Sequence, residues 1–231
     1  MLPIFGTKLI QVMKQTKKNS TPDKLLFEEE FGLKQHFSPY LLECGCDEAG
    51  RGCLAGPVLA AAVILPPNFN CLELNDSKQL SEKKRNELRI FIEKKSLAWA
   101  VAEVDNLEID DINILNASIL AMHRAIDKLS VRPEFIIVDG NKFKTYQDIH
   151  HQTIIKGDSK YQSIAAASIL AKTHRDELMS KLNKLYPKYG WNANKAYPTL
   201  FHRNAIKIYG ITPLHRLSFD LLGLKKLKVQ K

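Results

Sequence analysis

The sequence predicts an α/β fold. Two apolar runs, Val58 to Leu65 and Phe135 to Val138, have the length of buried strands. Apolar residues between Ile112 and Leu129 recur at alternating steps of three and four, which is the period of an amphipathic helix. The chain of 231 residues with 45% hydrophobic content can bury a sizeable core. We therefore expect one large domain, or one domain with an appendage.

The basic composition narrows the choice of partner. A formal net charge of +9 favours a polyanion, either nucleic acid or an anionic membrane surface. The longest apolar stretch ends at Pro66-Pro67 and is too short to span a membrane, and residues 1–20 lack the apolar core of a secretory signal. The protein is therefore expected in the cytoplasm, without a membrane partner.

The four cysteines do not predict a disulfide scaffold in a chain of this length. Cys44 and Cys46 would share one face of a strand, so a thiolate metal site is conceivable. No Cys-x-x-Cys spacing supports such a site. Buried free thiols are the favoured interpretation.

The first 40 residues carry the weakest pattern. Residues 14–24 are polar, residues 24–36 could form a short helix, and Met13 could be the true start of the protein. From Leu41 to Leu65 the pattern is strand, glycine turn and strand.

Three further elements follow this pair of strands. A helix is predicted to run to about Lys95 with Ser81 as its N-cap, and residues 97–104 alternate bulky and small side chains as a strand does. The amphipathic stripe of residues 112–129 predicts a helix that begins at Asp110 or Asp111 and packs against the core.

The second half of the chain again pairs strands with a helix. Pro133 ends the previous segment, and residues 135–138 form a strand that stops at Asp139. Residues 153–155 predict a short strand, and the segment after Ser159 predicts a long helix whose small residues allow a close approach to the sheet. Pro187 and Gly190 follow as signals for the end of that helix.

Two adjacent acids come directly before a glycine turn. Neighbouring residues on a strand point to opposite faces, so Asp47 and Glu48 can converge only where the strand ends. Gly50 and Gly52 can take positive φ and let backbone amides approach a ligand, and Arg51 between them is a donor well suited to phosphate. Divalent cations would reconcile the acids with phosphate. A solvated loop is the ordinary alternative for such a motif.

Two more acids lie at the ends of predicted elements. Asp139 follows a buried strand, although an Asp-Gly turn bonded to its own backbone would explain it equally well. Asp158 precedes the long helix and could be only an N-cap. Together with Asp47 and Glu48 they would form an anionic site in a basic protein, and two divalent metals would neutralise their repulsion. Oxygen ligands favour Mg²⁺ or Mn²⁺ over zinc.

Five segments in the same order resemble the ribonuclease HII family. They are Asp47-Glu48-Ala49-Gly50-Arg51-Gly52, Asn75-Asp76-Ser77-Lys78, Val138-Asp139-Gly140, Lys156-Gly157-Asp158-Ser159-Lys160 with residues 163–168, and residues 194–199 with His215-Arg216 and Ser218-Phe219. The match extends from about Leu41 to Phe219, which makes it far more specific than any single motif.

The resemblance implies a fold and an activity. The fold is a ribonuclease H-like mixed sheet whose first three strands are antiparallel, flanked by helices and followed by a C-terminal helical appendage. The implied domains are an N-terminal extension of residues 1–40, a catalytic domain of residues 41–186 and a substrate-binding segment of residues 187–231. The implied activity is Mg²⁺- or Mn²⁺-dependent hydrolysis of RNA in RNA/DNA hybrids and incision 5′ to ribonucleotides embedded in duplex DNA. We expect the protein to act as a monomer and to use two-metal hydrolysis.

The resemblance also implies roles for individual residues. Asp47, Glu48, Asp139 and Asp158 match the family's metal ligands. Gly50, Arg51 and Gly52 match its loop for sensing the 2′-hydroxyl, the group that distinguishes RNA from DNA. Tyr197 matches an aromatic residue that packs on the sugar after the ribonucleotide. Ala196 departs from the family, which usually has glycine there, and the first 40 residues exceed the usual lead-in.

Other interpretations of these residues stay open. Ser77 and Lys78 precede a helix and could contact phosphate, or could be solvated surface. Tyr197 precedes Pro198-Thr199, a helix-start signal with Pro in the first turn, and could instead pack the C-terminal segment onto the body.

The roles of two histidines and the function of the protein also have alternative interpretations. For His202 and His215, which lie among basic residues, phosphate contact or helix capping is favoured over catalysis. A nuclease of the same fold with another substrate, such as a junction resolvase, is one competing function. A basic nucleic-acid binder without catalysis is another.

Overall fold

The computed structural model describes residues 32–38, 41–74 and 80–224. The described residues belong to one compact unit. Most of the predicted helix in residues 24–36, together with Ser77 and Lys78, lies outside the described residues.

A five-stranded mixed sheet forms the centre of this unit. The strand order is β3-β2-β1-β4-β5, in which β1, β2 and β3 pair antiparallel while β4 and β5 are parallel to β1. The strands are β1 (Glu43–Ala49), β2 (Val58–Ile64), β3 (Ala98–Val104), β4 (Phe135–Asp139) and β5 (His150–Ile154). The predicted α/β fold, including the three antiparallel strands, is confirmed.

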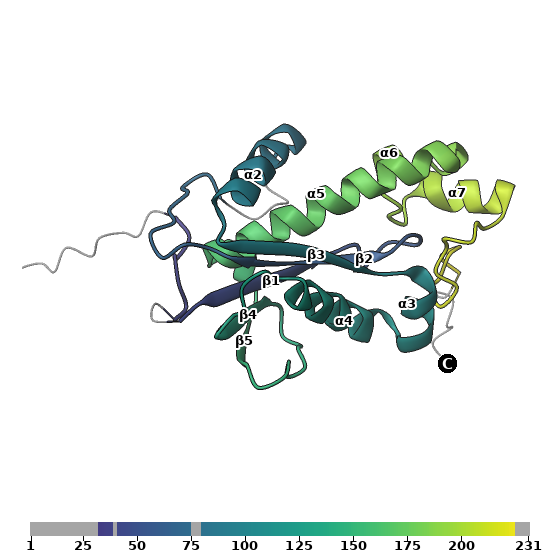
Figure 1. Ribbon diagram of the computed structural model, residues 1–231. Helices are drawn as coiled ribbons and strands as arrows, with labels where there is room; N and C mark the ends of the chain where they lie inside the picture. Colours follow the sequence, from purple (N-terminus) through teal and green to yellow (C-terminus); the bar gives the residue numbers. More distant parts are fainter. Residues whose placement is uncertain (1–31, 39–40, 75–79, 225–231) are drawn as a thin grey trace, which may run out of the picture. The chain divides into compact units, whose positions relative to one another are not determined.

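Helices cover both faces of the sheet (Figure 1). One face carries α5 with α2 beside it, and the other carries α4. The helical elements are α2 (Glu82–Lys95), α3 (Asn106–Ile112), α4 (Ile114–Asp127), η1 (Gly157–Ser159), α5 (Gln162–Leu185), η2 (Pro187–Tyr189), α6 (Trp191–Asn194) and α7 (Leu200–Tyr209).

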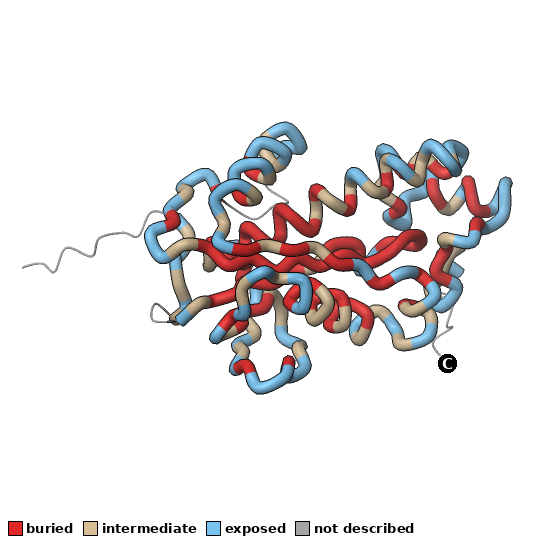
Figure 2. The backbone as a smooth tube through the Cα atoms, in the orientation of Figure 1, coloured by how far each residue is buried: buried red, intermediate tan, exposed pale blue. Residues whose placement is uncertain are grey.

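The two faces of the sheet bury separate apolar clusters, and β1 and β2 between them are buried along most of their length, whereas no residue of β5 is buried (Figure 2). The α4 face packs Cys44 and Cys46 of β1 against α4. The α5 face packs consecutive alanines, Ala165 to Ala167, which bring the helix close to β1. A third cluster around Trp191 and Met179 joins the C-terminal helices to α5. Cys44, Cys46 and Cys53 are buried free thiols, as the sequence predicts, whereas Cys71 is partly exposed.

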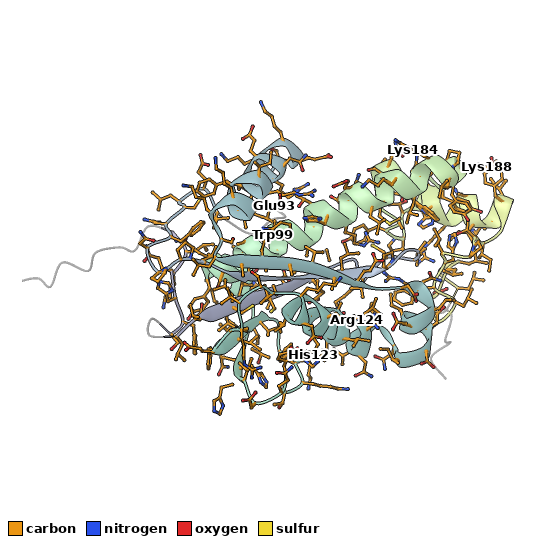
Figure 3. All side chains as sticks on the ribbon, in the orientation of Figure 1. Glu93, Trp99, His123, Arg124, Lys184 and Lys188 are labelled. Atoms are coloured by element: carbon orange, nitrogen blue, oxygen red, sulfur yellow. The ribbon has the colours of Figure 1, made fainter. Side chains whose placement is uncertain are left out.

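The region after β3 differs from the prediction. The expected helix from Asp110 or Asp111 is instead two helices, α3 and α4, separated at Asn113 with φ +66°. Asn113 accepts hydrogen bonds from the N–H groups of Leu115 and Asn116 and so caps α4. An ion pair with two contacts of 2.7 and 2.8 Å between Arg124 and Glu108 joins α4 to α3. Figure 3 labels Arg124 on α4.

Of the other predicted helix ends, one is confirmed and two are wrong. Ser81 caps α2, with its hydroxyl accepting the N–H of Lys84, as predicted. Asp158 is not the N-cap of the long helix, because it lies in η1 and Tyr161 occupies the cap position of α5. Pro198 lies before α7 and not in its first turn, since Thr199 is the N-cap.

None of the helices in the described part of the chain combines the length and apolar content that crossing a membrane requires.

Candidate active site

Asp47 and Glu48 lie at the C-terminal end of β1 and point to opposite faces of the sheet. The α5 face receives Asp47, whose carboxylate interacts with the Ser168 hydroxyl of α5 and accepts the Glu48 N–H at 2.7 Å. Two residues earlier, Gly45 lets β1 touch α5 directly, because a Cβ there would lie 2.3 Å from the Ser163 carbonyl carbon. The missing side chain at Gly45 therefore sets how deeply Asp47 is buried.

Asp139 reaches the same edge of the sheet from β4. Cys46 pairs with Val138 in the parallel β1–β4 ladder, so the next residues, Asp47 and Asp139, lie side by side. The Asp139 carboxylate accepts the N–H of Gly157 at 2.7 Å, and not a bond from its own turn. Asp158 follows Gly157 directly and is 4% exposed. Asp47 thus lies beside Asp139 at the end of the sheet, with Asp158 next to the residue that Asp139 contacts and Glu48 on the opposite face.

The electrostatics of Asp47 reflect its neighbouring acids. Burial raises the pKa of Asp47 well above its ordinary value, and the negative charges of Glu48 and Asp139 raise it further. The hydrogen bonds from Ser168 and from the Glu48 N–H oppose the shift. A bound cation would relieve this repulsion between the carboxylates.

The carboxylate groups are suitable ligands for a divalent cation, but in this structure they form hydrogen bonds with protein groups. Within the described ranges, no three carboxylate, imidazole or thiol groups stand close enough together to hold a metal ion. Glu48 is drawn toward Arg51, with Oε1 3.1 Å from Nη1, and Asp139 is engaged by Gly157. The donor set of carboxylate oxygens suits Mg²⁺ or Mn²⁺.

The glycine turn after β1 lies next to Tyr197. Gly50 has φ +98°, a conformation that favours glycine, and a Cβ on it would lie 2.0 Å from Nε of Arg175. A Cβ on Gly52 would lie 3.9 Å from Cε1 of Tyr197, whose side chain is partly exposed. Arg51 is exposed between the two glycines. The structure therefore brings Gly50, Arg51, Gly52 and Tyr197 together.

The structure shows the backbone conformation at Ala196, the position where the family usually has glycine. Both Lys195 (φ +49°) and Ala196 (φ +65°) occupy the left-handed region, which explains why glycine would suit position 196. Ala196 is fully buried in the C-terminal cluster, so its methyl group gains packing in exchange for the backbone strain.

Four further residues, which sequence reasoning did not assign to the site, lie in the interior next to it. Arg175 and Arg216 are buried and donate to backbone carbonyls around the glycine turn, among them those of Pro57 and Gly50. Arg175 lies in the polar run Lys172-Thr173-His174-Arg175-Asp176-Glu177 of the predicted long helix, where no feature of the sequence marks it as buried. His202 and His215 are also buried, which corrects the expectation of phosphate contact or helix capping.

The two histidines form a neutral buried pair. Their Nε2 atoms are 3.3 Å apart, and the Trp191 indole N–H donates to His202 at 3.0 Å. Burial lowers the pKa of His202, and burial together with the neighbouring His202 lowers the pKa of His215 to about 4.

This pair predicts a pH-dependent stability. Between pH 7 and pH 5 the unfolded chain protonates His215 while the folded protein keeps it neutral, so stability falls as pH falls. Urea unfolding should show the folded state about 2 kcal/mol less stable at pH 5 than at pH 7 from this residue. His215→Gln should flatten the difference by that amount, and an equal difference in both proteins would contradict the assignment.

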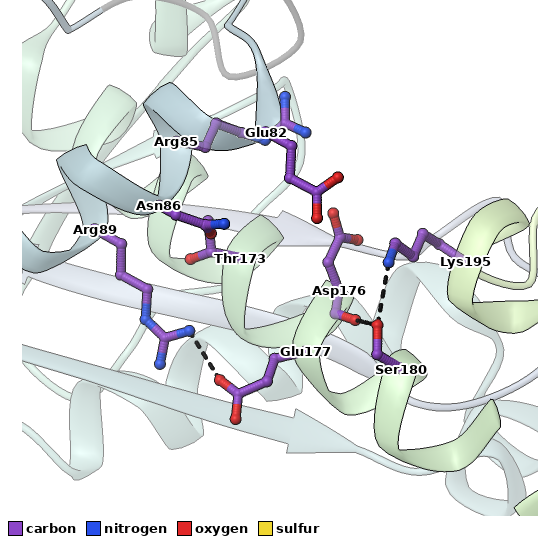
Figure 4. A pocket seen from close by; sticks show the side chains of 9 residues that line it. All are labelled: Glu82, Arg85, Asn86, Arg89, Thr173, Asp176, Glu177, Ser180 and Lys195. Atoms are coloured by element: carbon purple, nitrogen blue, oxygen red, sulfur yellow. Dashed lines mark hydrogen bonds and ion pairs between the residues drawn. The ribbon is translucent and has the colours of Figure 1, made fainter. Parts of the chain in front are cut away.

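A separate pocket of about 330 Å³ lies between α2 and α5 (Figure 4). Its charged lining balances, with three basic and three acidic side chains: Arg85, Arg89, Lys195, Glu82, Asp176 and Glu177. It contains none of the four acids. This pocket is therefore distinct from the candidate site.

Comparisons with known proteins agree on one family. A family model described as Ribonuclease HII matches residues 44–222. A curated Ribonuclease HII from Phocaeicola vulgatus is 63% identical over 191 residues, which cover 83% of this chain and 95% of that protein.

Two solved structures share the fold. The ribonuclease H2 of Pyrococcus horikoshii OT3 has 25% identity and a TM-score of 0.66, covering 78% of this chain and 94% of that one. The RNase HII of Archaeoglobus fulgidus, solved as a PCNA complex, has 25% identity and a TM-score of 0.67, covering 78% and 95%.

Proposed function

The chain belongs to the ribonuclease HII family and is a type 2 ribonuclease H endonuclease, and we propose that it incises duplex DNA 5′ to single embedded ribonucleotides as well as cutting the RNA of RNA/DNA hybrids. The observation that carries this proposal is the juxtaposition of two features at the end of β1. Asp47 lies beside Asp139, and the glycine turn that follows lies beside Tyr197. Monomeric action in the cytoplasm stays a prediction.

Asp47, Glu48, Asp139 and Asp158 would hold two divalent cations, Mg²⁺ or Mn²⁺. When bound, these cations would supply the charge that activates a water and stabilises the departing 3′-oxygen, leaving a 5′-phosphate. The protein's part is to hold Asp47 rigidly between β1 and α5, where its carboxylate is buried and kept in place by Ser168. No covalent intermediate is needed.

The glycine turn and Tyr197 would choose the nucleotide to be cut. The turn would meet the 2′-hydroxyl, since glycine permits close backbone approach, and the exposed part of the Tyr197 ring would pack on the next sugar. Arg51 would contact phosphate and in doing so release Glu48, to which it is now bonded. Substrate binding would thus free a carboxylate for the cations.

The deciding experiment uses duplex DNA that contains one ribonucleotide, with an all-DNA duplex as control. Incubation with Mg²⁺ or Mn²⁺ should yield one cut on the 5′ side of the ribonucleotide, and chelator should abolish it. Binding without cleavage in both metals would favour a nucleic-acid binder. Cleavage of the all-DNA duplex would favour a nuclease of different substrate.

Variants at Tyr197 test the sensing role. Tyr197→Phe should retain most activity, while Tyr197→Ala should lose selectivity for the RNA-to-DNA junction by about 1–3 kcal/mol if sugar packing resembles base stacking in strength. The measurement compares cleavage of a single-ribonucleotide duplex with cleavage of an all-RNA hybrid strand. A purely structural tyrosine would instead lower the melting temperature of Tyr197→Ala and leave the preference unchanged.

A further inference from the structure

Two adjacent residues of the C-terminal segment connect the two halves of the proposed substrate-reading site. Arg216 donates through Nη1 to the carbonyl of Gly50 at 2.8 Å and to that of Arg51 at 3.1 Å, and through Nε to Gly56 at 2.9 Å. Its own N–H donates to the Leu54 carbonyl at 2.9 Å. Arg216 therefore holds the glycine turn from the inside.

The neighbouring His215 reaches Tyr197 through one other side chain. The Thr212 N–H donates to Nδ1 of His215 at 2.8 Å, so the ring proton of His215 lies on Nε2 and points at His202. An indole N–H can only donate, so Trp191 makes Nε2 of His202 an acceptor and places the His202 proton on Nδ1. That proton is donated to the carbonyl of Tyr197 at 3.1 Å.

Packing alone does not account for Arg216. The side chain is fully buried, its Nη2 has no hydrogen-bond partner in the described part of the chain, and no carboxylate there forms an ion pair with it. Burial, followed by the nearby Arg175 charge, lowers the pKa of Arg216 to about 10, which still leaves it cationic at neutral pH. An apolar side chain of similar size would avoid this cost. The guanidinium is explained by the three carbonyls of the turn segment that its planar donors fix together.

We propose that His215 and Arg216 are positioning residues that set the spacing between the Gly50–Gly52 turn and Tyr197, and that this spacing selects a ribonucleotide followed by DNA. The inference rests on the proposed function, in which the turn meets one nucleotide and Tyr197 the next. The two reading elements come from segments far apart in the chain, and discrimination between substrates needs them held within a fraction of an ångström. Arg175 reinforces the link, because it donates to the Lys195 and Ala55 carbonyls at 2.9 and 3.3 Å.

The test measures binding in an Asp47→Asn background, so that the substrate stays intact. The quantity is the ratio of the Kd for an all-DNA duplex to the Kd for a single-ribonucleotide duplex. Arg216→Met keeps the apolar volume and should reduce this ratio about tenfold, as a displaced contact group would. Arg203→Met is the matched control, since Arg203 lies in the same segment and also donates to a backbone carbonyl, that of Asp220 at 2.7 Å; it should leave the ratio unchanged.

A second pair of variants covers the case in which Arg216→Met fails to fold. His202→Asn can still donate toward the Tyr197 carbonyl and should keep more of the ratio than His202→Leu, which cannot. Folded Arg216→Met or His202→Leu protein with an unchanged ratio would overturn the inference. So would an equal loss in Arg203→Met, or a parent that does not discriminate the two duplexes. Failure of the proposed function would be a different result: the parent protein, without the Asp47→Asn substitution, would bind the single-ribonucleotide duplex selectively but would not cleave it.

Discussion

Asp47→Asn is expected to reduce cleavage at least about 1000-fold, because it removes a central charged ligand of the proposed cation site. Binding of the nucleic acid should be retained or improved, since the substitution reduces repulsion of phosphate. The metal-free variant should also melt higher than the parent, because the neutral amide relieves the burial and repulsion that raise the pKa of Asp47. Single-turnover cleavage, binding and melting with and without Mn²⁺ give the three readouts.

The control for this result lies on the same strand and face. Glu43 is buried like Asp47, but its carboxylate accepts the N–H groups of Phe37 and Ser38 and the Ser163 hydroxyl, away from the acids. Glu43→Gln should lower stability and leave the cleavage rate of the folded protein unchanged. Comparable cleavage by Asp47→Asn and the parent would remove the metal assignment. The melting temperature of the parent should rise with Mn²⁺ more than that of Asp47→Asn.

Gly45→Ala is expected to destabilise the protein by about 3 kcal/mol or more. The added Cβ would lie 2.3 Å from the carbonyl carbon of Ser163 and 2.5 Å from the Ile164 nitrogen, and both atoms belong to the backbone of α5, which cannot turn aside. The strand and the helix would have to separate where they hold Asp47 against Ser168. Cleavage should therefore fall together with stability, as measured by urea unfolding and activity.

Gly210→Ala provides the comparison for this change. Gly210 has φ +78° with no atom within 4 Å of a built Cβ, so it tests backbone strain without steric overlap. Its cost should be about 1–3 kcal/mol, because ψ is −165° and this region is almost exclusive to glycine, and cleavage should be unaffected. A Gly45→Ala protein as stable as Gly210→Ala would show that β1 and α5 can move apart freely, and the close packing would then not position the acid.

The strands and most helix signals could be predicted from sequence because each rests on local periodicity. β1 to β3 and the Ser81 cap of α2 follow from alternation and capping chemistry. The break at Asn113 was missed because the apolar stripe continues across it from Ile112. A stripe records which face is buried and not whether the backbone is continuous.

Part of the candidate site could likewise be predicted from the sequence, and part could not. The proximity of Asp47 and Asp139 could be predicted from the sequence, because acids at the C-terminal ends of parallel strands lie at one edge of the sheet. The support behind the glycine turn could not, because the Arg216 contact to Gly56 joins residues 160 positions apart. Nothing local distinguishes a buried arginine of this kind from a solvated one, so the roles of Arg216 and of the histidine pair required three-dimensional contacts.

The parallel pairing of β1 with β4 has a consequence for the order of folding. The contact that begins this ladder, from the Leu42 N–H to the Glu134 carboxylate, spans 92 residues, whereas β1, β2 and β3 are close neighbours in sequence. During synthesis the three-stranded meander can form before β4 has been made, and β1, which carries Asp47 and Glu48, is then an open edge. Closing this long loop is the entropically costly step and should limit the folding rate. Until it closes, the strand that bears half of the acidic site is one of two open edges, with β3 as the other, and can pair with another nascent chain.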